Sequence, residues 1–471
     1  MFKRIKFGTD GWRAIIAKEF TVENVAGVSL ACAAWINMKF KNPKVVVGFD
    51  TRFGGAMFAE TVSKVLASRG VEVITSKSFV PTPAVSYAIT ALEAVFGIVI
   101  TASHNPAGYN GYKLKGIHGG PLMEDDIRNI ENLINPDMEI DLDQISLENL
   151  TEKGLVKYID IETLYTDHLK RSFKLDLIAK SRFRFAFDPM FGSGQNIMKK
   201  ILPGVKSINN NPDPLFNGTS PEPLARNLRD FMSFMEKSGK YDCGLAVDGD
   251  ADRIALVNSK GEYIDSHHVI LLLIHYLAGY RQQTGKIITG FSSTVKIEKL
   301  AAHYNLEVER VRIGFKDISK HMLKEDVLVG GEESGGIGVK GHIPERDGIW
   351  MGLLIWQMMA ESDKSLETLI SEIYSITGAF AFERSDLHID KDMKNRVMEK
   401  CKNNEFKKFG SYKVKSVSDF DGYKYFFDDN TWLMIRPSGT EPVLRTYAEA
   451  ATQEEAALIL EEARRLIFSQ T

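Results

Sequence analysis

The sequence predicts an α/β protein of four domains, in which three similar α/β units precede a smaller α+β unit. The chain has 471 residues, and domains of roughly 100–200 residues make three or four the expected number. Strand-like and helix-like runs alternate over most of the length, whereas the C-terminal part shows several strands and one or two helices. We expect the domains at residues 1–160, 161–263, 264–380 and 381–471.

Composition excludes several classes of protein. Hydrophobic residues make up 44% and charged residues 26% of the chain, which is ordinary for a globular protein and not for a disordered one. The net charge of −3 leaves no basic excess to neutralise a nucleic acid backbone. The longest apolar runs, residues 269–279 and 349–360, are shorter than the ~18 residues of a membrane span and predict buried helices. We expect neither nucleic acid nor membrane as a partner.

The cysteines and the N-terminus indicate the compartment. Cys32, Cys243 and Cys401 are odd in number and far apart, which suits neither a disulfide framework nor a thiolate zinc site. The first residues, MFKRIKFGTDGW, include basic side chains but not the apolar run of a signal peptide. We expect a cytoplasmic protein.

The first three domains are predicted from a repeated strand–helix–strand order. Residues 44–49 are β-branched, residues 56–70 show helical spacing, and a second strand starts at Val71, which predicts parallel strands joined by helices. Related segments start at residues 183–188 and 286–291, and three further strands end in the unusual loops TASHNP, DGDADR and GGEESGG. Because ligands of open parallel sheets bind beyond the carboxyl ends of the strands, these loops are candidate functional segments.

The C-terminal domain is predicted from a different pattern. Residues 423–436 are an expected hairpin around residues 428–430, and VLRTYAEA is a further strand. A helix is expected to start at Thr452, where Glu455 stands at the spacing of a capping box. This pattern indicates a small α+β domain.

The loop TASHNPAGYNGYKL follows an apolar strand and contains Ser103, His104 and Lys113. Ser103 is a candidate nucleophile or phosphate carrier, since a serine reacts when a base, a metal or a preformed phosphoester activates it. The alternative is an ordinary turn, for which Ser, Asn, Pro and Gly are typical residues. We expect His104 to brace the loop rather than bind a ligand.

The loop DGDADR contains three alternating carboxylates, Asp248, Asp250 and Asp252. In an extended loop they can converge on one hard cation, and without a cation they would repel one another. An EF-hand is excluded because Arg253 stands where that motif requires glycine and Ser259 where it requires glutamate. Magnesium, which takes few carboxylates plus a phosphate oxygen, fits better than calcium, and the alternative is a solvated acidic turn.

Two further loops offer hydrogen-bonding groups. In GGEESGG, Glu332 and Ser334 could bind the vicinal hydroxyls of a sugar, although glycine-rich acidic turns are also common. In RPSGTEP, the guanidinium of Arg436, the hydroxyls of Ser438 and Thr440 and nearby backbone N–H groups suit a dianionic phosphate. The alternative for this segment is an ordinary Pro-Ser-Gly turn.

Three basic residues stand in other turns: Arg13 in FGTDGWRA, Arg52 in GFDTRF and Lys316 in the loop RIGFKD. Each of them alone is typical of a surface charge. They become candidate site residues only in combination with the four loops.

The ordered motifs TASHNP, DGDADR, GEESGG and RPSGTEP closely resemble those of the α-D-phosphohexomutase family, which includes phosphoglucomutases and phosphomannomutases. The resemblance covers almost the whole chain, and four independent motifs in this order are very specific. It implies a heart-shaped protein with three similar α/β domains and a fourth, TATA-binding-protein-like α+β domain. The active site would be the central cleft, to which each domain contributes one loop.

The resemblance implies roles for the matching residues of the first two loops. Ser103 would be the phosphorylated serine, and Asp248, Asp250 and Asp252 would hold Mg²⁺ together with its phosphate. Near the phosphoserine the family carries basic residues at the positions of Arg13 and Lys113, and Arg253 extends the metal loop.

The last two loops would bind the substrate. By the resemblance, Glu332 and Ser334 would hold sugar hydroxyls. The phosphate that does not react would be bound by Arg436, Ser438, Gly439 and Thr440.

The activity implied by the resemblance is interconversion of hexose 1-phosphate and hexose 6-phosphate. Phospho-Ser103 would give its phosphoryl group to a sugar hydroxyl, a hexose 1,6-bisphosphate would turn over in the cleft, and the other phosphate would return to the serine. Mg²⁺ would neutralise charge on the transferring group, and glucose 1,6-bisphosphate would be the activator. Lys113 is the candidate for general acid–base work on the hydroxyl, with Arg13 assisting electrostatically.

Glucose phosphates are the expected substrates and are favoured over mannose phosphates, which are possible, while phosphoglucosamine mutase is the runner-up activity. Dual-specificity mutases and phosphoglucosamine mutases often carry a histidine where Gly336 stands, and residues 314–317 and 342–348 look like those of glucose-type relatives. Lys316 and His342 are therefore secondary substrate-binding candidates. The open alternatives are a phosphoglucosamine mutase, a phosphosugar phosphatase and a non-catalytic sugar-phosphate sensor, and the oligomeric state stays open between monomer and dimer.

Overall fold

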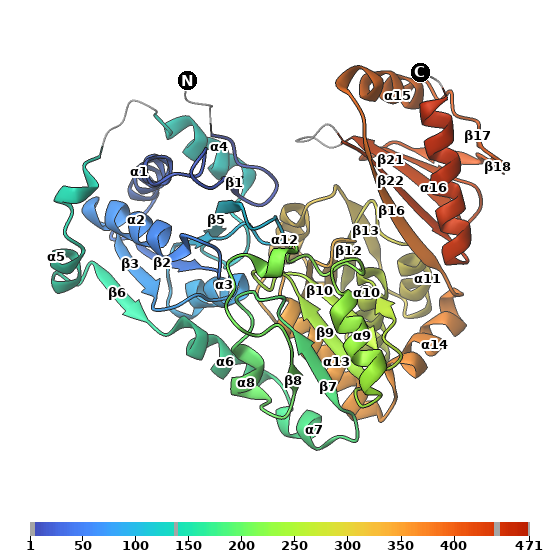
Figure 1. Cartoon of the computed structure of the whole chain (residues 1–471), viewed down its shortest axis with the longest axis horizontal. Helices are drawn as coiled ribbons and strands as arrows, with labels where there is room; N and C mark the ends of the chain where they lie inside the picture. Colours follow the sequence, from blue (N-terminus) through green and yellow to red (C-terminus); the bar gives the residue numbers. More distant parts are fainter. Residues whose placement is uncertain (1–4, 136–139, 438–442, 470–471) are drawn as a thin grey trace.

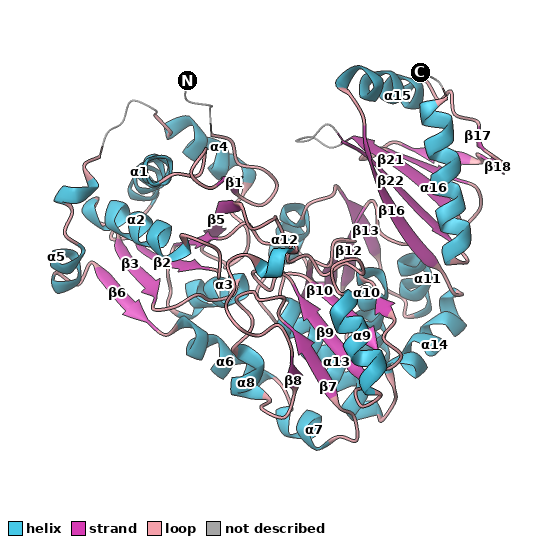
Figure 2. Ribbon diagram, viewed as in Figure 1, coloured by secondary structure: helices cyan, strands magenta, loops and turns pink. Residues whose placement is uncertain are grey.

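The computed structural model describes residues 5–135, 140–437 and 443–469. These residues form four main sheets that follow one another along the chain. The first and last units are the two arms of a heart-shaped molecule, and the second and third units join them at the base (Figure 1). Helices pack against the sheet of each unit (Figure 2).

The first unit contains a six-stranded sheet. Its strands are β1 (Trp12–Ile15), β2 (Lys44–Phe49), β3 (Glu72–Ser76), β4 (Phe96–Ile100), β5 (Tyr109–Gly116) and β6 (Val156–Ile159). Its helices are α1 (Val22–Lys39), α2 (Gly55–Ser68), α3 (Thr82–Ala91), α4 (Glu124–Leu133), the 3₁₀ turn η1 (Leu142–Gln144) and α5 (Leu147–Glu152). The helices α6 (Ile161–Ser172) and α7 (Leu175–Lys180) lead to the second unit.

The second unit contains a five-stranded sheet. Its strands are β7 (Phe185–Asp188), β8 (Lys206–Ser207), β9 (Cys243–Val247), β10 (Ile254–Asn258) and β11 (Tyr263–Ile264). Its helical segments are α8 (Ile197–Ile201), η2 (Phe216–Gly218) and α9 (Arg229–Ser238).

The third unit contains a four-stranded sheet. Its strands are β12 (Lys286–Gly290), β13 (Val308–Val311), β14 (Val327–Gly331) and β15 (Ile337–Val339). Its helices are α10 (Ser266–Ile274), the π-helical η3 (His275–Tyr280), α11 (Lys296–His303), α12 (Phe315–Lys324), α13 (Gly348–Ser362) and α14 (Leu366–Thr377).

The first three sheets repeat one topology, as the related sequence segments predict. They contain the strand orders β5-β4-β2-β3, β10-β9-β7-β8 and β15-β14-β12-β13. Three strands of each set are parallel to one another, but the outer strands β5, β10 and β15 run antiparallel to β4, β9 and β14. The predicted parallel strand–helix–strand unit is confirmed for β2 and β3, and the antiparallel outer strand is a feature that this prediction did not cover. Each candidate loop is too short for the helical crossover that a parallel connection requires.

The fourth unit is the predicted α+β unit. Its strands are β16 (Ala381–His388), β17 (Lys408–Phe409), β18 (Tyr412–Lys413), β19 (Ser416–Ser418), β20 (Tyr423–Phe426), β21 (Trp432–Pro437) and β22 (Val443–Ala450), and its helices are α15 (Lys391–Lys402) and α16 (Gln453–Phe468). The predicted hairpin is confirmed as the antiparallel pair β20–β21. Thr452 caps α16 by accepting the N–H of Glu455 at 3.3 Å, and the Glu455 carboxylate accepts the N–H of Ala451.

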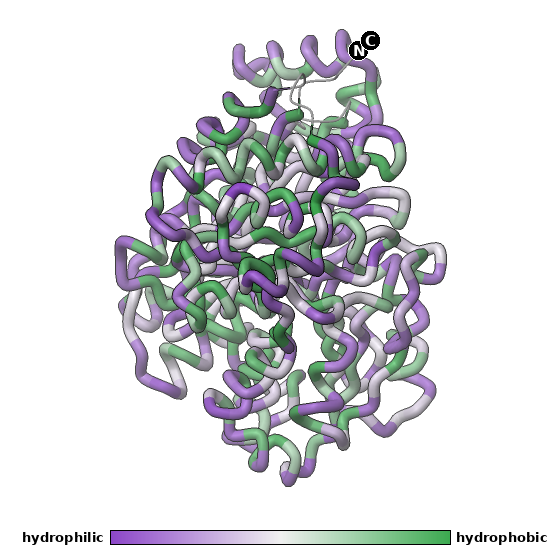
Figure 3. The backbone as a smooth tube through the Cα atoms, turned by 90° about the vertical axis from the view of Figure 1, so that its left-hand side faces the viewer, coloured by the Kyte–Doolittle hydropathy of each residue, from purple (hydrophilic) through white to green (hydrophobic). Residues whose placement is uncertain are grey.

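Both predicted apolar runs form buried helices. The first run lies in α10, which continues into η3, and the second lies in α13. Together with parts of α3, β7 and β9 they build one core that spans the first three units. Hydrophobic and hydrophilic segments alternate along the backbone (Figure 3), as amphipathic elements around shared cores require. Among the described residues, no helix is long and apolar enough to cross a membrane.

The fourth unit packs on the third through an aromatic cluster. Phe291 after β12 joins Trp432, Met434 and Tyr447 of the fourth sheet. The ammonium group of Lys424 lies 3.6 Å from the centre of a Trp432 ring and donates to the carbonyl oxygen of Phe291 at 3.3 Å. This contact holds the fourth arm against the base of the heart.

Candidate active site

Three of the predicted loops meet, one from each of the first three units. They follow the central strands β4, β9 and β14, and each leads into the antiparallel outer strand. Arg253 and Gly336 form a β-bridge between the second and third loops. A Cβ atom on Gly249 would lie 2.6 Å from the carbonyl oxygen of Ser103, so the first and second loops also touch.

Ser103 stands at the tip of the first loop with its hydroxyl directed at the second loop. Its Oγ donates to Oδ2 of Asp248 at 2.6 Å, and its N–H donates to Thr101 Oγ1 at 2.9 Å. The backbone adopts a left-handed conformation (φ 52°), which is uncommon for a residue other than glycine. Such strain is typical of functional sites where the surrounding structure holds a side chain in a required direction.

Arg52 holds the backbone of this loop. Its guanidinium donates to the carbonyl oxygens of Ser103 at 2.5 Å and Asn105 at 2.6 Å, and it also reaches those of Pro106 and Tyr109. The buried Asp50 carboxylate lies 3.2 Å from Arg52 Nε. Arg52 is therefore a structural clamp on the serine loop rather than a surface charge.

His104 lies beside the serine, with Nδ1 3.2 Å from Ser103 Oγ. Burial, followed by the nearby cations Arg253 and Arg13, holds the pKa of His104 well below its ordinary value. The imidazole is therefore neutral at pH 7 and suits the bracing role expected for it.

The three aspartates of the second loop converge. One oxygen from each of Asp248, Asp250 and Asp252 lies within 4.8 Å of the others, and all three residues are fully buried. Burial and the charges of its two neighbours raise the pKa of Asp248 well above its ordinary value. Oδ1 of Asp250 and Oδ1 of Asp252 have no hydrogen-bond partner among the described residues. Buried carboxylates with free oxygens are the donor set that a hard divalent cation prefers, so these residues fit Mg²⁺.

We expect Mg²⁺ to stabilise the folded protein by binding these three aspartates. A ligand at 100 times its dissociation constant stabilises the native state by about 2.7 kcal/mol, which a thermal unfolding scan detects. The stabilisation should disappear with EDTA and in Asp252→Asn. The control is Glu325→Gln in the half-buried group Glu309, His321 and Glu325, where Lys286 already neutralises Glu325 at 2.9 Å. An equal loss in both variants would contradict binding at the aspartates.

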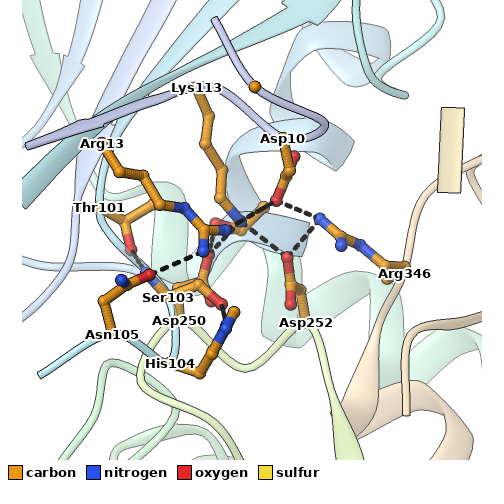
Figure 4. Close-up of polar contacts among 12 residues, drawn as sticks. Asp10, Arg13, Thr101, Ser103, His104, Asn105, Lys113, Asp250, Asp252 and Arg346 are labelled. Atoms are coloured by element: carbon orange, nitrogen blue, oxygen red, sulfur yellow. Dashed lines mark hydrogen bonds and ion pairs between the residues drawn. The ribbon is translucent and has the colours of Figure 1, made fainter. Parts of the chain in front are cut away.

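Lys113 on β5 faces the same carboxylates. Its Nζ lies 2.7 Å from Asp250, 2.8 Å from Asp252 and 2.8 Å from Asp10, and its side chain is 1% exposed (Figure 4). Burial lowers the pKa of Lys113, but the three carboxylates outweigh it and raise the pKa above its ordinary value. Lys113 is therefore held as a cation, which suits neutralisation of negative charge. A raised pKa makes the ammonium group a weak proton donor, so the geometry favours this electrostatic role over general acid or base work.

Arg13 and Arg253 approach the serine loop from the first and second units. Arg13 on β1 donates to Asn105 Oδ1 at 2.8 Å and lies 3.5 Å from Asp10. Arg253 donates its backbone N–H to Oδ1 of Asp248 at 3.1 Å, and its guanidinium lies 3.4 Å from Glu222. The structure brings both predicted residues to the surroundings of Ser103.

Glu332 and Ser334 lie in the third loop. Burial raises the pKa of Glu332 to about 7, although the Arg346 guanidinium opposes this shift. Glu332 is buried and Ser334 is half-buried. The loop that contains both residues meets the aspartate loop through the β-bridge between Arg253 and Gly336.

The two secondary substrate-binding candidates, Lys316 and His342, lie in different surroundings. Lys316 was expected in a loop, but it lies in the first turn of α12, where the left-handed Gly314 (φ 134°) precedes the helix. Its Nζ donates to the carbonyl oxygen of Gly8 in the first unit at 3.0 Å. His342 does not join the carboxylates around Lys113. Its imidazole stacks on Trp350 with the ring centres 3.7 Å apart, and its Nε2 lies 2.9 Å from Oδ2 of Asp347.

The fourth loop is only partly described. Arg436 lies on β21, and its Nε is 3.3 Å from Asp421 Oδ1. Ser438, Gly439 and Thr440 lie outside the described residues. The strands β21 and β22 belong to the arm opposite β5 (Figure 1), and the ion pair of Arg436 in the described part of the chain is with Asp421, not with a residue around Ser103.

Sequence reasoning missed two charged residues at the centre of the site. They are Asp10 and Arg346. Oδ2 of Asp10 forms ion pairs with both Lys113 and Arg346, at 2.5 Å from the latter. Arg346 also lies 2.7 Å from Asp252 (Figure 4). Both residues stand in polar segments, GTDGW and HIPERDG, in which no local pattern shows which side chain points inward.

Comparison with known proteins identifies the family of all four units. Models of the phosphoglucomutase/phosphomannomutase family match in order: α/β/α domain I at residues 4–141, domain II at 163–261, domain III at 265–376 and the C-terminal domain at 393–466.

Individual relatives match over almost their whole length. A phosphoglucosamine/phosphogalactosamine mutase of Sulfurisphaera tokodaii is 31% identical, and a phosphoglucomutase/phosphomannomutase of Thermococcus kodakarensis is 30% identical, each with 98% of both chains covered. A crystal structure of a Thermus thermophilus protein, provisionally named a phosphomannomutase, has a TM-score of 0.87 at 32% identity and covers 99% of this chain and 100% of its own. The fold is also that of the open form of the Paramecium phosphoglucomutase parafusin, with a TM-score of 0.82 at 21% identity over 99% and 96% of the two chains. The chain therefore belongs to the α-D-phosphohexomutase family, whose members are intramolecular phosphotransferases.

Proposed function

We propose that this phosphohexomutase interconverts glucose 1-phosphate and glucose 6-phosphate through a phosphoserine at Ser103 and a glucose 1,6-bisphosphate intermediate. The observation that carries the proposal is the 2.6 Å hydrogen bond from Ser103 Oγ to Asp248, inside the cluster of three buried aspartates. A serine hydroxyl that faces a candidate metal site is suited to carry a phosphoryl group.

The residues around Ser103 fit a phosphoryl transfer. The bond between Ser103 Oγ and phosphorus breaks as a sugar hydroxyl oxygen forms the new bond, and the hydroxyl loses a proton while Oγ regains one. Lys113, held cationic by three carboxylates, would supply positive charge beside the transferring group. Arg13 adds a second cation beside the loop. Mg²⁺, which Asp248, Asp250 and Asp252 would hold, supplies charge neutralisation on the transferring group.

The substrate would be held at its hydroxyls and at its second phosphate. Glu332 and Ser334 are the proposed hydroxyl ligands because the third loop contacts the aspartate loop. Arg436 is the proposed ligand of the non-reacting phosphate, with Ser438, Gly439 and Thr440 beside it in sequence. The arm that carries Arg436 would have to approach the serine loop for this contact, a domain movement of the hinge type.

Phosphoglucosamine mutase is the second candidate for the activity. It is favoured by the name of the Sulfurisphaera tokodaii relative at 31% identity. Glucose is favoured by Gly336, which leaves the third loop without the histidine common in glucosamine-type relatives.

Relative turnover of three sugar phosphates tests the proposal. Glucose 1-phosphate, mannose 1-phosphate and glucosamine 1-phosphate are compared with Mg²⁺ and a trace of the matching 1,6-bisphosphate, and the 6-phosphate product is measured. We expect the highest kcat/KM for glucose 1-phosphate, by about tenfold over the others, the range that one substituent contributes in a binding pocket. A higher kcat/KM for glucosamine 1-phosphate would replace glucose with glucosamine as the substrate. Release of inorganic phosphate as the main product would favour a phosphatase.

A further inference from the structure

Arg346 is a residue of the third unit whose side chain forms ion pairs with both of the other units of the site. It stands between β15 and α13 of the third unit, and its Nη2 lies 2.5 Å from Asp10 of the first unit and 2.7 Å from Asp252 of the second. The side chain is 5% exposed. In Figure 4 it enters the carboxylate cluster from the side opposite Arg13. A guanidinium that bridges two carboxylates fixes both of their orientations.

The segment around Arg346 cannot shift easily. The neighbouring Glu345 forms a fully buried ion pair with Lys115 of β5. A Cβ atom on Gly120 would lie 2.5 Å from the carbonyl oxygen of Pro344, so the first unit packs directly on this backbone. Glu345 also accepts the N–H of Arg346 at 2.9 Å. Arg346 is thus anchored at its backbone and at its guanidinium.

The third loop passes over the aliphatic part of Arg346 at Gly336. A Cβ atom on Gly336 would lie 2.4 Å from Cδ and 3.1 Å from Cγ of Arg346, and 3.2 Å from Oε2 of Glu332. The φ angle of Gly336 lies outside the left-handed region, so the backbone itself accepts a side chain. The obstacle to a larger residue is therefore the Arg346 side chain, which would have to leave its place.

We propose that Arg346 and Gly336 act as a pair: Arg346 is a positioning residue that orients Asp252 and the Glu332 loop, and it can do so because position 336 has no side chain. This inference rests on the proposed roles of Asp252 and Glu332. Any side chain at position 336 would displace Arg346 and loosen the contact between the sugar loop and the aspartate loop. The pair would thereby contribute to the choice of sugar, because the Glu332 carboxyl lies beside both residues.

A double-mutant cycle with Gly336→Ala, Arg346→Ala and the double variant tests the pair. Misplacement of site residues by about 1 Å costs about 10²-fold in rate, so we expect each single variant to lose between about tenfold and 10²-fold in kcat/KM for glucose 1-phosphate. Because Gly336→Ala acts by displacing Arg346, the double variant should be no slower than Arg346→Ala alone. Arg346→Lys should recover part of the loss, since it restores the charge but lacks the planar guanidinium and has a different reach.

Two further measurements separate positioning from loss of fold. Thermal unfolding shows whether each variant is folded, and kcat and KM are determined separately for glucose and glucosamine 1-phosphate. We expect the ratio of kcat/KM for the two sugars to change in the same direction in both single variants, which a general loss of stability would not produce. The control for an added methyl group is Gly27→Ala in α1, where a Cβ atom would meet no heavy atom within 4 Å.

The inference is overturned if Gly336→Ala is as active as the unmodified protein, or if the losses of the two single variants multiply in the double variant. These outcomes differ from failure of the proposed function. In that case, the unmodified protein would itself convert none of the tested hexose phosphates.

Discussion

Replacement of Ser103 by alanine is expected to lower mutase turnover by at least about 10³-fold. The hydroxyl is the atom that carries the phosphoryl group in the proposed reaction, and removal of a covalent nucleophile typically leaves only the residual rate of the remaining site. The neighbouring hydroxyl of Thr101 is not an equivalent substitute, because it donates to the buried Asp50 at 2.5 Å rather than to the aspartate loop. The other groups at the tip of the described loop are the neutral His104 and the amide of Asn105. Conversion of glucose 1-phosphate to glucose 6-phosphate, coupled to a dehydrogenase, measures the loss.

The matched control is Ser63→Ala in α2. Ser63 is also a buried serine of the first unit, and its hydroxyl donates to the carbonyl oxygen of Ala59 at 2.8 Å. Its replacement should leave turnover within about twofold, as expected for a side chain remote from the site. A second readout is transfer of labelled phosphate from glucose 1,6-bisphosphate to the protein, which should be seen in Ser63→Ala and lost in Ser103→Ala. Phosphorylation and turnover that persist in Ser103→Ala would exclude the phosphoserine assignment.

Replacement of Lys113 by methionine is expected to reduce kcat by about 10²–10³-fold, the range for loss of one preorganised electrostatic stabiliser. Its ammonium group touches Asp10, Asp250 and Asp252, so its removal takes a cation from a buried cluster of carboxylates. Methionine keeps roughly the length of the side chain but supplies neither charge nor proton. The measurement is kcat and KM for glucose 1-phosphate at saturating Mg²⁺.

Stability has to be measured in the same experiment, because loss of one partner from a buried ion pair costs about 3–5 kcal/mol. Thermal unfolding with and without Mg²⁺ shows whether the variant is folded, and a bound cation would compensate part of the lost charge. The control is Lys157→Met on β6, whose ammonium forms an exposed pair with Glu72 at 2.7 Å. We expect little change there, since exposed pairs contribute about 0–1 kcal/mol. A folded Lys113→Met with kcat within about threefold of the unmodified protein would remove Lys113 from the chemistry.

The sequence was most informative where a function is contained in one short loop. Ser103 and the three aspartates lie in loops of a few residues directly after apolar strands, and the structure brings those loop tips together, with Ser103 Oγ 2.6 Å from Asp248. Short motifs predict site residues well, because their spacing and the direction of the preceding strand already determine where the side chains point. The length of these loops also indicates the direction of the strand that follows them. Six residues between β9 and β10 are too few for a parallel crossover, so the antiparallel outer strand was predictable.

The segment HIPERDG illustrates where such reasoning stops. It contains four charged or titratable side chains, of which His342 was the predicted site residue. In the structure His342 stacks on Trp350, while Arg346, four residues later, enters the carboxylate cluster. The segment has no regular period that would assign one residue to the core, and its direction is imposed by the Lys115–Glu345 ion pair with another unit. The proposed domain boundaries stay predictions for a related reason, since one core spans the first three units.

The sequence by itself determined the four-unit α/β and α+β order, the repeated loops at the ends of strands, and the residues of the family motifs. These features depend on local periodicity and on short spacings, which neighbouring residues encode together. Only the tertiary structure decided that Asp10, Lys113, Asp252 and Arg346 share one buried cluster, and that Gly336 leaves room for Arg346. These contacts join residues from three units, and the physical reason is that a long-range ion pair depends on how whole sheets pack, which no local pattern records.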